Sequence, residues 1–186
     1  MGRPKQLLPW GQSTLLEQTL RNVRNSRLRR MIVVTGYRAA DVAAIARRAG
    51  AAVVHNPEYA EGEMLSSLQV AVARLPARCQ AVLVMLADQP LVEPQTIDRL
   101  LAAYEEGRAQ LIAPTYKGRR GNPVLIGRPY FAELLALPRG AAPRDLLQRH
   151  PDALQLVAGD SQSVLVDIDR PADYEKHRPP LEPDAP

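Results

Sequence analysis

Continuous apolar runs alternate along the chain with segments whose apolar side chains recur at helical spacing. Apolar runs at 31–35, 51–55 and 81–86 are rich in alanine and β-branched residues, and they predict strands. The intervening segments at 41–49 and 65–75 place apolar residues on one face of a helix. Because these strands are apolar throughout rather than at alternate positions, they are typical of a parallel sheet that is covered on both faces.

The same pattern extends to both ends of the chain. Thr14 and Glu17 form a capping box that predicts a helix as far as about Arg24. Strands that alternate with helices imply a three-layer α/β/α domain with a mainly parallel sheet. The remaining expected elements are a helix at 94–106, a strand at 111–113, a hairpin or flap within 116–128, helices near 130–135, 144–150 and 171–177, and strands at 154–157 and 163–168.

Composition narrows the class of protein. The 186 residues are 46% hydrophobic and 24% charged, which suits a folded domain, and no run reaches the roughly 18 apolar residues of a membrane span. One cysteine, Cys79, excludes a disulfide framework, and without a signal peptide we expect a cytoplasmic protein. The net charge of +4 is spread along the chain, which favours an anionic small molecule and requires no nucleic acid or membrane partner. We find no linker, so we expect one domain at 1–178 and a disordered tail at 179–186.

Three aspartates stand where expected strands end. Asp88 follows the run at 81–86, and Pro90 stiffens the chain after it, so its carboxylate is expected at the carboxyl end of the sheet. Asp167 and Asp169 end the expected strand at 163–168, where alternation puts both on the same side. Mg²⁺ is usually held by one or two such carboxylates. Each aspartate has helix capping as an alternative role, but their joint occurrence favours a metal site.

Two further segments carry groups that suit phosphate. Near the start of the chain, Gly2 permits close backbone approach, and Arg3 and Lys5 supply two cations, although a solvated basic terminus has the same composition. Ser66 and Ser67 begin an expected helix, where backbone N–H groups favour anions, although a serine there also serves as a cap.

A basic loop follows in the second half of the chain. Asn122, before Pro123, offers both a donor and an acceptor to a base or pterin edge, with a plain β-turn as the alternative. The three histidines have no metal-ligand spacing, and neither a Gly-x-Ser-x-Gly elbow nor a P-loop is present. The sequence therefore gives no indication of a hydrolase, a zinc enzyme or a P-loop ATPase.

In this order, these motifs resemble the MobA-like nucleotidyltransferases, particularly the molybdenum cofactor cytidylyltransferase branch. The resemblance implies a Rossmann-like nucleotidyltransferase fold and transfer of a nucleotide from an NTP to a phosphate-bearing pterin, with Mg²⁺ required, pyrophosphate released and CTP favoured over GTP. It also implies that Lys5 binds the triphosphate, and that Asp88 and either Asp167 or Asp169 hold Mg²⁺. The motifs are 1–9, 14–17, 33–36, 56–57, 62–68, 87–90, 121–124 and 167–174.

This chain departs from the family pattern in three places. Its first residue follows the position of the family's first strand and glycine-rich loop, which predicts an N-terminally truncated domain whose neighbouring strands have unpaired edges. Our hypothesis is that Met1 is an internal methionine, which upstream codons for such a loop would support. In the segment at 139–144 only Arg144 keeps the family residue, which leaves it as a candidate substrate contact, and 62–68 is one residue longer than the common form.

Two other functions share this pattern. One is a non-catalytic accessory protein that contacts a molybdoenzyme or its chaperone, and the other is a sugar-phosphate nucleotidyltransferase. An enzyme of this kind must bind NTP and release pyrophosphate, which the accessory protein does not do. Substrate profiling separates the two transferases.

Overall fold

The protein is represented by a computed structural model that describes residues 4–61 and 63–180. Gly2, Arg3 and most of the expected tail, at 181–186, lie outside the described residues. No helix in the described part of the chain is long and apolar enough to cross a bilayer. The α-helices are α1 (Leu15–Arg24), α2 (Ala39–Arg48), α3 (Glu63–Val72), α4 (Pro94–Glu105), α5 (Phe131–Ala136), α6 (Pro143–Arg149) and α7 (Pro171–His177).

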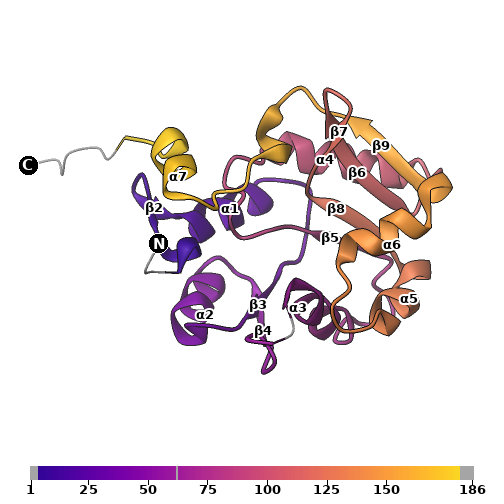
Figure 1. Ribbon diagram of the computed structural model, residues 1–186, viewed down its shortest axis with the longest axis horizontal. Coiled ribbons are helices and arrows are strands. Elements are labelled where there is room, and N and C mark those ends of the chain that lie inside the picture. Colours follow the sequence, from indigo (N-terminus) through magenta and orange to yellow (C-terminus); the bar gives the residue numbers. More distant parts are fainter. Residues whose placement is uncertain (1–3, 62, 181–186) are drawn as a thin grey trace, which may run out of the picture.

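The strands form one mixed sheet, one parallel pair and one short hairpin (Figure 1). In the mixed sheet β8 pairs antiparallel with both β5 and β6, β7 pairs antiparallel with β6, and β9 pairs parallel with β6. The parallel pair is β3 with β4, and the hairpin is β1 with β2. The strands are β1 (Pro9–Trp10), β2 (Ser13–Thr14), β3 (Ile32–Thr35), β4 (Ala52–His55), β5 (Ala81–Val84), β6 (Leu111–Tyr116), β7 (Arg119–Arg120), β8 (Val124–Gly127) and β9 (Leu154–Ala158).

Alternate residues of the central strands enter two different cores. On β6, Leu111 and Ala113 pack with residues of α3, α5 and α6, whereas Ile112 between them packs with α4. On β8, Ile126 belongs to the first core and Leu125 to the second. Because side chains of a strand point to opposite faces in turn, helices cover the sheet on both sides. The expected α/β fold with three layers is confirmed.

The expected hairpin is confirmed, but the piece after it belongs to the main sheet. Strands β6 and β7 are joined at Lys117 and Gly118, which both have positive φ, as a tight type of hairpin turn requires. The second extended piece is β8, which lies between β5 and β6 rather than forming part of a flap. Both β7 and β8 run antiparallel to β6, whereas β9 runs parallel to it, so the sheet is mixed.

The prediction of a strand at 163–168 is wrong. Residues Gln162–Leu165 form the 3₁₀-helix η4, whose start is capped by the Ser161 hydroxyl accepting from the Ser163 amide. Backbone bonds close locally here, since the Val166 amide donates to the Ser163 carbonyl. The β-branched residues of this segment favour extended backbone, but the hydroxyl cap and local turn prevail.

Two strands lie at the edges of their sheets. Within residues 4–61 and 63–180, β3 pairs with β4 alone and β5 pairs with β8 alone.

Helix α1 begins with the expected capping box. The Thr14 hydroxyl accepts from the Glu17 amide at 3.2 Å, and the Glu17 carboxylate accepts from the Thr14 amide at 2.9 Å. Burial raises the pKa of the Glu17 carboxyl. Its hydrogen bonds to Arg48 and Thr14 lower that pKa by more than burial raises it, so the pKa lies below its usual 4.5. Charged Glu17 therefore stabilises the fold above pH 4.5, and the contribution is lost as the pH falls through the folded-state pKa.

Glu17→Gln is accordingly expected to lower the free energy of unfolding at pH 7 by about 0.5–1 kcal/mol. Urea unfolding at pH 7 and at pH 3 measures this difference, which should be present at pH 7 and small at pH 3. Glu106→Gln, at an exposed pair with Arg108, is the control and is expected to be neutral at both pH values. A Glu17→Gln effect of equal size at both pH values would contradict a role for the charge.

Candidate active site

The loop that follows β5 is anchored by polar residues of α1. The Thr19 hydroxyl donates to the Leu15 carbonyl of its own helix at 3.0 Å and lies 3.4 Å from the Ala87 carbonyl. The Asn22 amide nitrogen donates to the carbonyls of Pro90 and Val92 at 2.8 and 2.9 Å, and Asn22 is buried. Helix α1 thereby fixes the backbone on both sides of Asp88, at the carboxyl end of β5.

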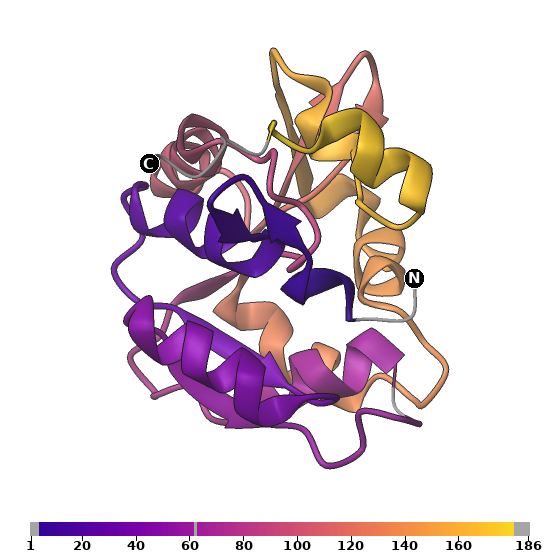
Figure 2. The same ribbon diagram turned by 90° about the vertical axis from the view of Figure 1, so that its left-hand side faces the viewer.

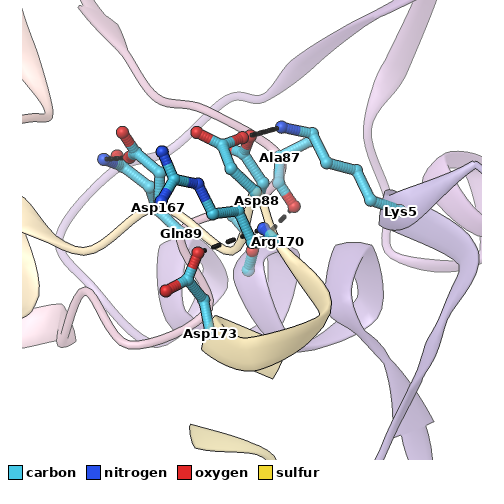
Figure 3. Close-up of polar contacts among 9 residues, drawn as sticks. Lys5, Ala87, Asp88, Gln89, Asp167, Arg170 and Asp173 are labelled. Carbon is cyan, nitrogen blue, oxygen red and sulfur yellow. Dashed lines mark hydrogen bonds and ion pairs between the residues drawn. The ribbon is translucent and has the colours of Figure 1, made fainter. Parts of the chain in front are cut away.

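Lys5 joins two of the predicted aspartates. It begins the 3₁₀-helix η1 (Lys5–Leu7), and its amine donates to Oδ2 of Asp88 (Figure 3) and to Oδ1 of Asp169. The Asp88 side chain is 13% exposed, whereas those of Lys5 and Asp169 are 37% and 57% exposed. The buried end of this group is therefore Asp88, and Asp169 lies at its solvent side.

The environment of Lys5 keeps its amine charged. Burial lowers the pKa of Lys5, but the hydrogen bonds and charges of Asp169 and Asp88 raise it more, so the pKa lies above its usual 10.5. The ammonium is therefore present throughout the physiological pH range, as binding to a phosphate requires.

Asp167 is held by the residue next to Asp88. The Gln89 side-chain nitrogen donates to Oδ1 of Asp167 at 2.5 Å, and Gln89 is itself buried. Burial raises the pKa of Asp167 above its usual 3.8. The Gln89 hydrogen bond lowers this pKa, whereas the nearby charges of Asp88 and Asp169 raise it.

We name the group formed by Lys5, Asp88, Asp167 and Asp169 the acidic cluster.

The acidic cluster has an oxygen available for a cation. Asp88 Oδ1 is buried and has no hydrogen-bond partner within the described residues. No group of three or more His, Cys, Asp and Glu side chains in the described part of the chain is arranged to hold a metal ion. Mg²⁺ needs only one or two protein carboxylates when substrate phosphates and waters complete its shell, so Asp88 with Asp167 or Asp169 fits this ion.

The two predicted serines have a structural partner. Asn56, which follows β4, is buried, and its side-chain nitrogen donates to the hydroxyls of Ser66 and Ser67 at 2.8 and 3.0 Å. Both serines lie in α3, which packs against β3. These contacts tie α3 to the end of β4. Because α3 begins at Glu63, the two serines lie in its second turn rather than at the expected helix start.

The Gly-Asn-Pro segment also has a structural role. A side chain at Gly121 would lie 2.2 Å from the Val164 carbonyl oxygen, so the backbone approach to η4 requires glycine. The backbone amide of Asn122 donates to that same carbonyl at 2.9 Å, and Pro123 directly precedes β8. Arg144 is an exposed residue of α6. No hydrogen bond or ion pair among the described residues joins Asn122 or Arg144 to the acidic cluster.

Sequence reasoning missed the residues that support the aspartates. Gln89, Thr19 and Asn22 are buried and polar, and each bonds a part of the site. Thr19 and Asn22 are polar residues spaced three apart among the apolar residues of α1, and that spacing is the only sequence signal for them. Figure 3 also shows the Arg170 side chain extending toward the acidic cluster from the start of α7.

Helix α7 is held against the β1–β2 hairpin. The Trp10 and Tyr174 rings lie 6.2 Å apart, and the Tyr174 hydroxyl donates to the Pro9 carbonyl at 2.5 Å. Figures 1 and 2 both place α7 near the β1–β2 hairpin. This contact brings Asp169, just before α7, close to Lys5, just before the hairpin.

Comparison with known proteins gives relatives across most of the chain. The molybdenum cofactor cytidylyltransferase of Escherichia coli (strain K12) is 27% identical over 176 residues, which cover 94% of this chain and 86% of that protein. Nicotine blue oxidoreductase of Paenarthrobacter nicotinovorans is 30% identical over 179 residues, which cover 91% and 85%. The manganese complex of Rv0371C from Mycobacterium tuberculosis H37Rv superposes with a TM-score of 0.77 at 29% identity, covering 94% and 91%.

The family model for the MobA-like NTP transferase domain matches residues 1–154. This range includes Lys5, Asp88 and every strand of the mixed sheet except β9, of which it reaches the first residue. The chain belongs to the MobA-like NTP transferase domain family.

Proposed function

We propose that this chain is a Mg²⁺-dependent nucleotidyltransferase that moves CMP from CTP to the phosphate of a molybdopterin-type cofactor and releases pyrophosphate. The observation that carries the proposal is the acidic cluster, in which a charged lysine and three carboxylates meet beside the carboxyl end of β5. The similarity to a cytidylyltransferase supports the choice of CTP and of the pterin acceptor.

The carboxylates and the lysine have different proposed roles, since the carboxylates bind the metal ion and the lysine binds the phosphates. Asp88 and Asp167 would hold Mg²⁺, because Asp88 has the buried oxygen without a partner and Asp167 does not bond the lysine in this structure. When bound, Mg²⁺ would neutralise charge on the triphosphate as the transferred phosphorus becomes pentacoordinate. Lys5 would exchange its bonds to Asp88 and Asp169 for the phosphates and bind the departing pyrophosphate.

The reaction needs no covalent enzyme intermediate. An oxygen of the acceptor phosphate attacks the α-phosphorus, a new P–O bond forms, and the bond to the β-phosphate oxygen breaks with its electron pair leaving on pyrophosphate. The chain supplies position and charge, which account for most catalysis of phosphoryl transfers. Arg144 and Asn122 stay candidate contacts for the acceptor and the base, and a molybdoenzyme or its chaperone would receive the product.

Calorimetric titration with CTP and with GTP, each with and without Mg²⁺, tests this proposal. We expect Mg²⁺-dependent binding of CTP that is tighter than that of GTP, and pyrophosphate release when a molybdopterin acceptor is added. A folded chain that binds neither nucleotide would instead support an accessory protein. Pyrophosphate release with sugar phosphates alone would identify a sugar-phosphate nucleotidyltransferase.

A further inference from the structure

We propose that Gln89 is a positioning residue, which holds the Asp167 carboxylate in place beside Asp88 for a divalent cation. The proposal rests on the proposed function, because it assigns a cation to the acidic cluster. It adds a residue that touches neither the lysine nor a substrate in our mechanism. Gln89 acts through Asp167 alone.

Gln89 is itself rigidly placed. It is 1% exposed, and its backbone lies in a turn in which the Gln89 amide donates to Leu86 and the Val92 amide donates to Gln89. The carbonyls of Pro90 and Val92 are in turn bound by Asn22 of α1. The side-chain nitrogen of Gln89 is therefore a fixed donor.

Asp167, in contrast, lies in a segment without regular structure. Residues 166–170 connect η4 to α7, and none of them belongs to a strand or a helix. The backbone bond next to Asp167 runs from the Ile168 amide to the Asp88 carbonyl at 3.0 Å. That bond sets the distance between the two backbones, while the direction of the carboxylate depends on the 2.5 Å bond from Gln89.

An amide is the side chain that this position needs. It donates a hydrogen bond without adding charge, whereas a lysine would neutralise Asp167 and a glutamate would repel it. The donor occupies Oδ1 of Asp167 and leaves Oδ2 for a cation. Partners of this kind, which orient a metal ligand, typically change metal affinity by about 10- to 100-fold when removed.

The cost to folding distinguishes this role from a structural one. Oε1 of Gln89 is buried and has no hydrogen-bond partner within the described residues. An unpaired buried oxygen is unfavourable, and methionine of similar length would remove it together with the donor. Gln89→Met is therefore expected to keep the melting temperature near that of the wild type while it weakens cation binding.

Mn²⁺ titration of the purified full chain, followed by the electron paramagnetic resonance of free Mn²⁺ in the presence of CTP, tests the proposal. We expect Gln89→Met to weaken Mn²⁺ binding by about 10-fold or more. Asp167→Asn should weaken it at least as much, and adding Gln89→Met to Asp167→Asn should cause no further loss, because the glutamine acts through the carboxylate.

The chain offers a matched control in Gln155, a residue of β9 whose Oε1 is also buried without a partner among the described residues. Gln155→Met should leave Mn²⁺ affinity unchanged. If Gln89→Met does not fold, Gln89→Asn, which shortens the side chain by one methylene, is expected to show the same loss of affinity.

Each outcome decides a different question. Wild-type Mn²⁺ affinity in Gln89→Met, or additive losses in the double variant, would overturn the role of Gln89 and leave the proposed function standing. A wild-type chain that is folded and binds no Mn²⁺ would overturn the cation site, and with it both proposals.

Discussion

Asp88→Ala is expected to lower the rate of nucleotidyl transfer by at least about 10²- to 10³-fold while the chain keeps its fold. The variant removes the buried oxygen proposed to bind the cation and one of the two carboxylates that bond Lys5. The backbone at position 88 still accepts from the Ile168 amide, and α1 still holds the loop through Asn22. The chemistry is lost because the charge on the triphosphate is no longer neutralised, not because the loop moves.

Pyrophosphate release measures this loss, and circular dichroism with thermal unfolding measures the fold. Asp160→Ala is the control, since Asp160 is an exposed carboxylate that pairs with Arg99 outside the acidic cluster. It should retain wild-type activity. Full activity in a folded Asp88→Ala chain would contradict the proposed function.

Most of the fold followed from patterns that tertiary contacts reinforce. The apolar runs of β5 and β6 lie between layers of helices, so burial and strand propensity act in the same direction there. The capping box of Thr14 and Glu17 is a local signal that depends on no distant residue, and it was confirmed at the predicted position.

Prediction was wrong where local bonds outweigh propensity. Val164 favours extended backbone, but it lies inside the 3₁₀-helix η4, whose start is capped by Ser161. Asp167 and Asp169 nevertheless join one cluster, although no strand alternation aligns them. Gln89 holds Asp167 there by a hydrogen bond, and Lys5 holds Asp169.

The site was predictable only in its charged members. A carboxylate after a buried strand, as at Asp88, has few places to lie other than the carboxyl end of the sheet. The role of Gln89 depends on which residue faces it across 78 positions of sequence, and no local pattern encodes that distance. The same holds for Asn22, whose partners lie 68 and 70 residues away.

Lys5→Met is expected to change two properties in opposite directions. In the free protein the Lys5 ammonium neutralises Asp88 and Asp169, so it competes with any cation for these carboxylates. Removal of this competing cation should tighten the binding of Mn²⁺ without nucleotide by several-fold. A tenfold change in affinity would correspond to about 1.4 kcal/mol of binding free energy. Nucleotidyl transfer should fall by about 10²-fold or more, because the triphosphate and departing pyrophosphate lose a cation.

This opposition separates a catalytic lysine from a structural one. If Lys5 served only to hold η1 against the aspartates, its loss would disorder the cluster, and Mn²⁺ affinity and transfer would fall together. Lys176→Met, in the last turn of α7, is the control that should alter neither. Tighter Mn²⁺ binding together with an unchanged transfer rate would contradict the proposed contact of Lys5 with the triphosphate, while it would keep the competition for Asp88. The raised pKa of Lys5 means that this competition persists at any pH below 10.5, so both effects are expected across the neutral range.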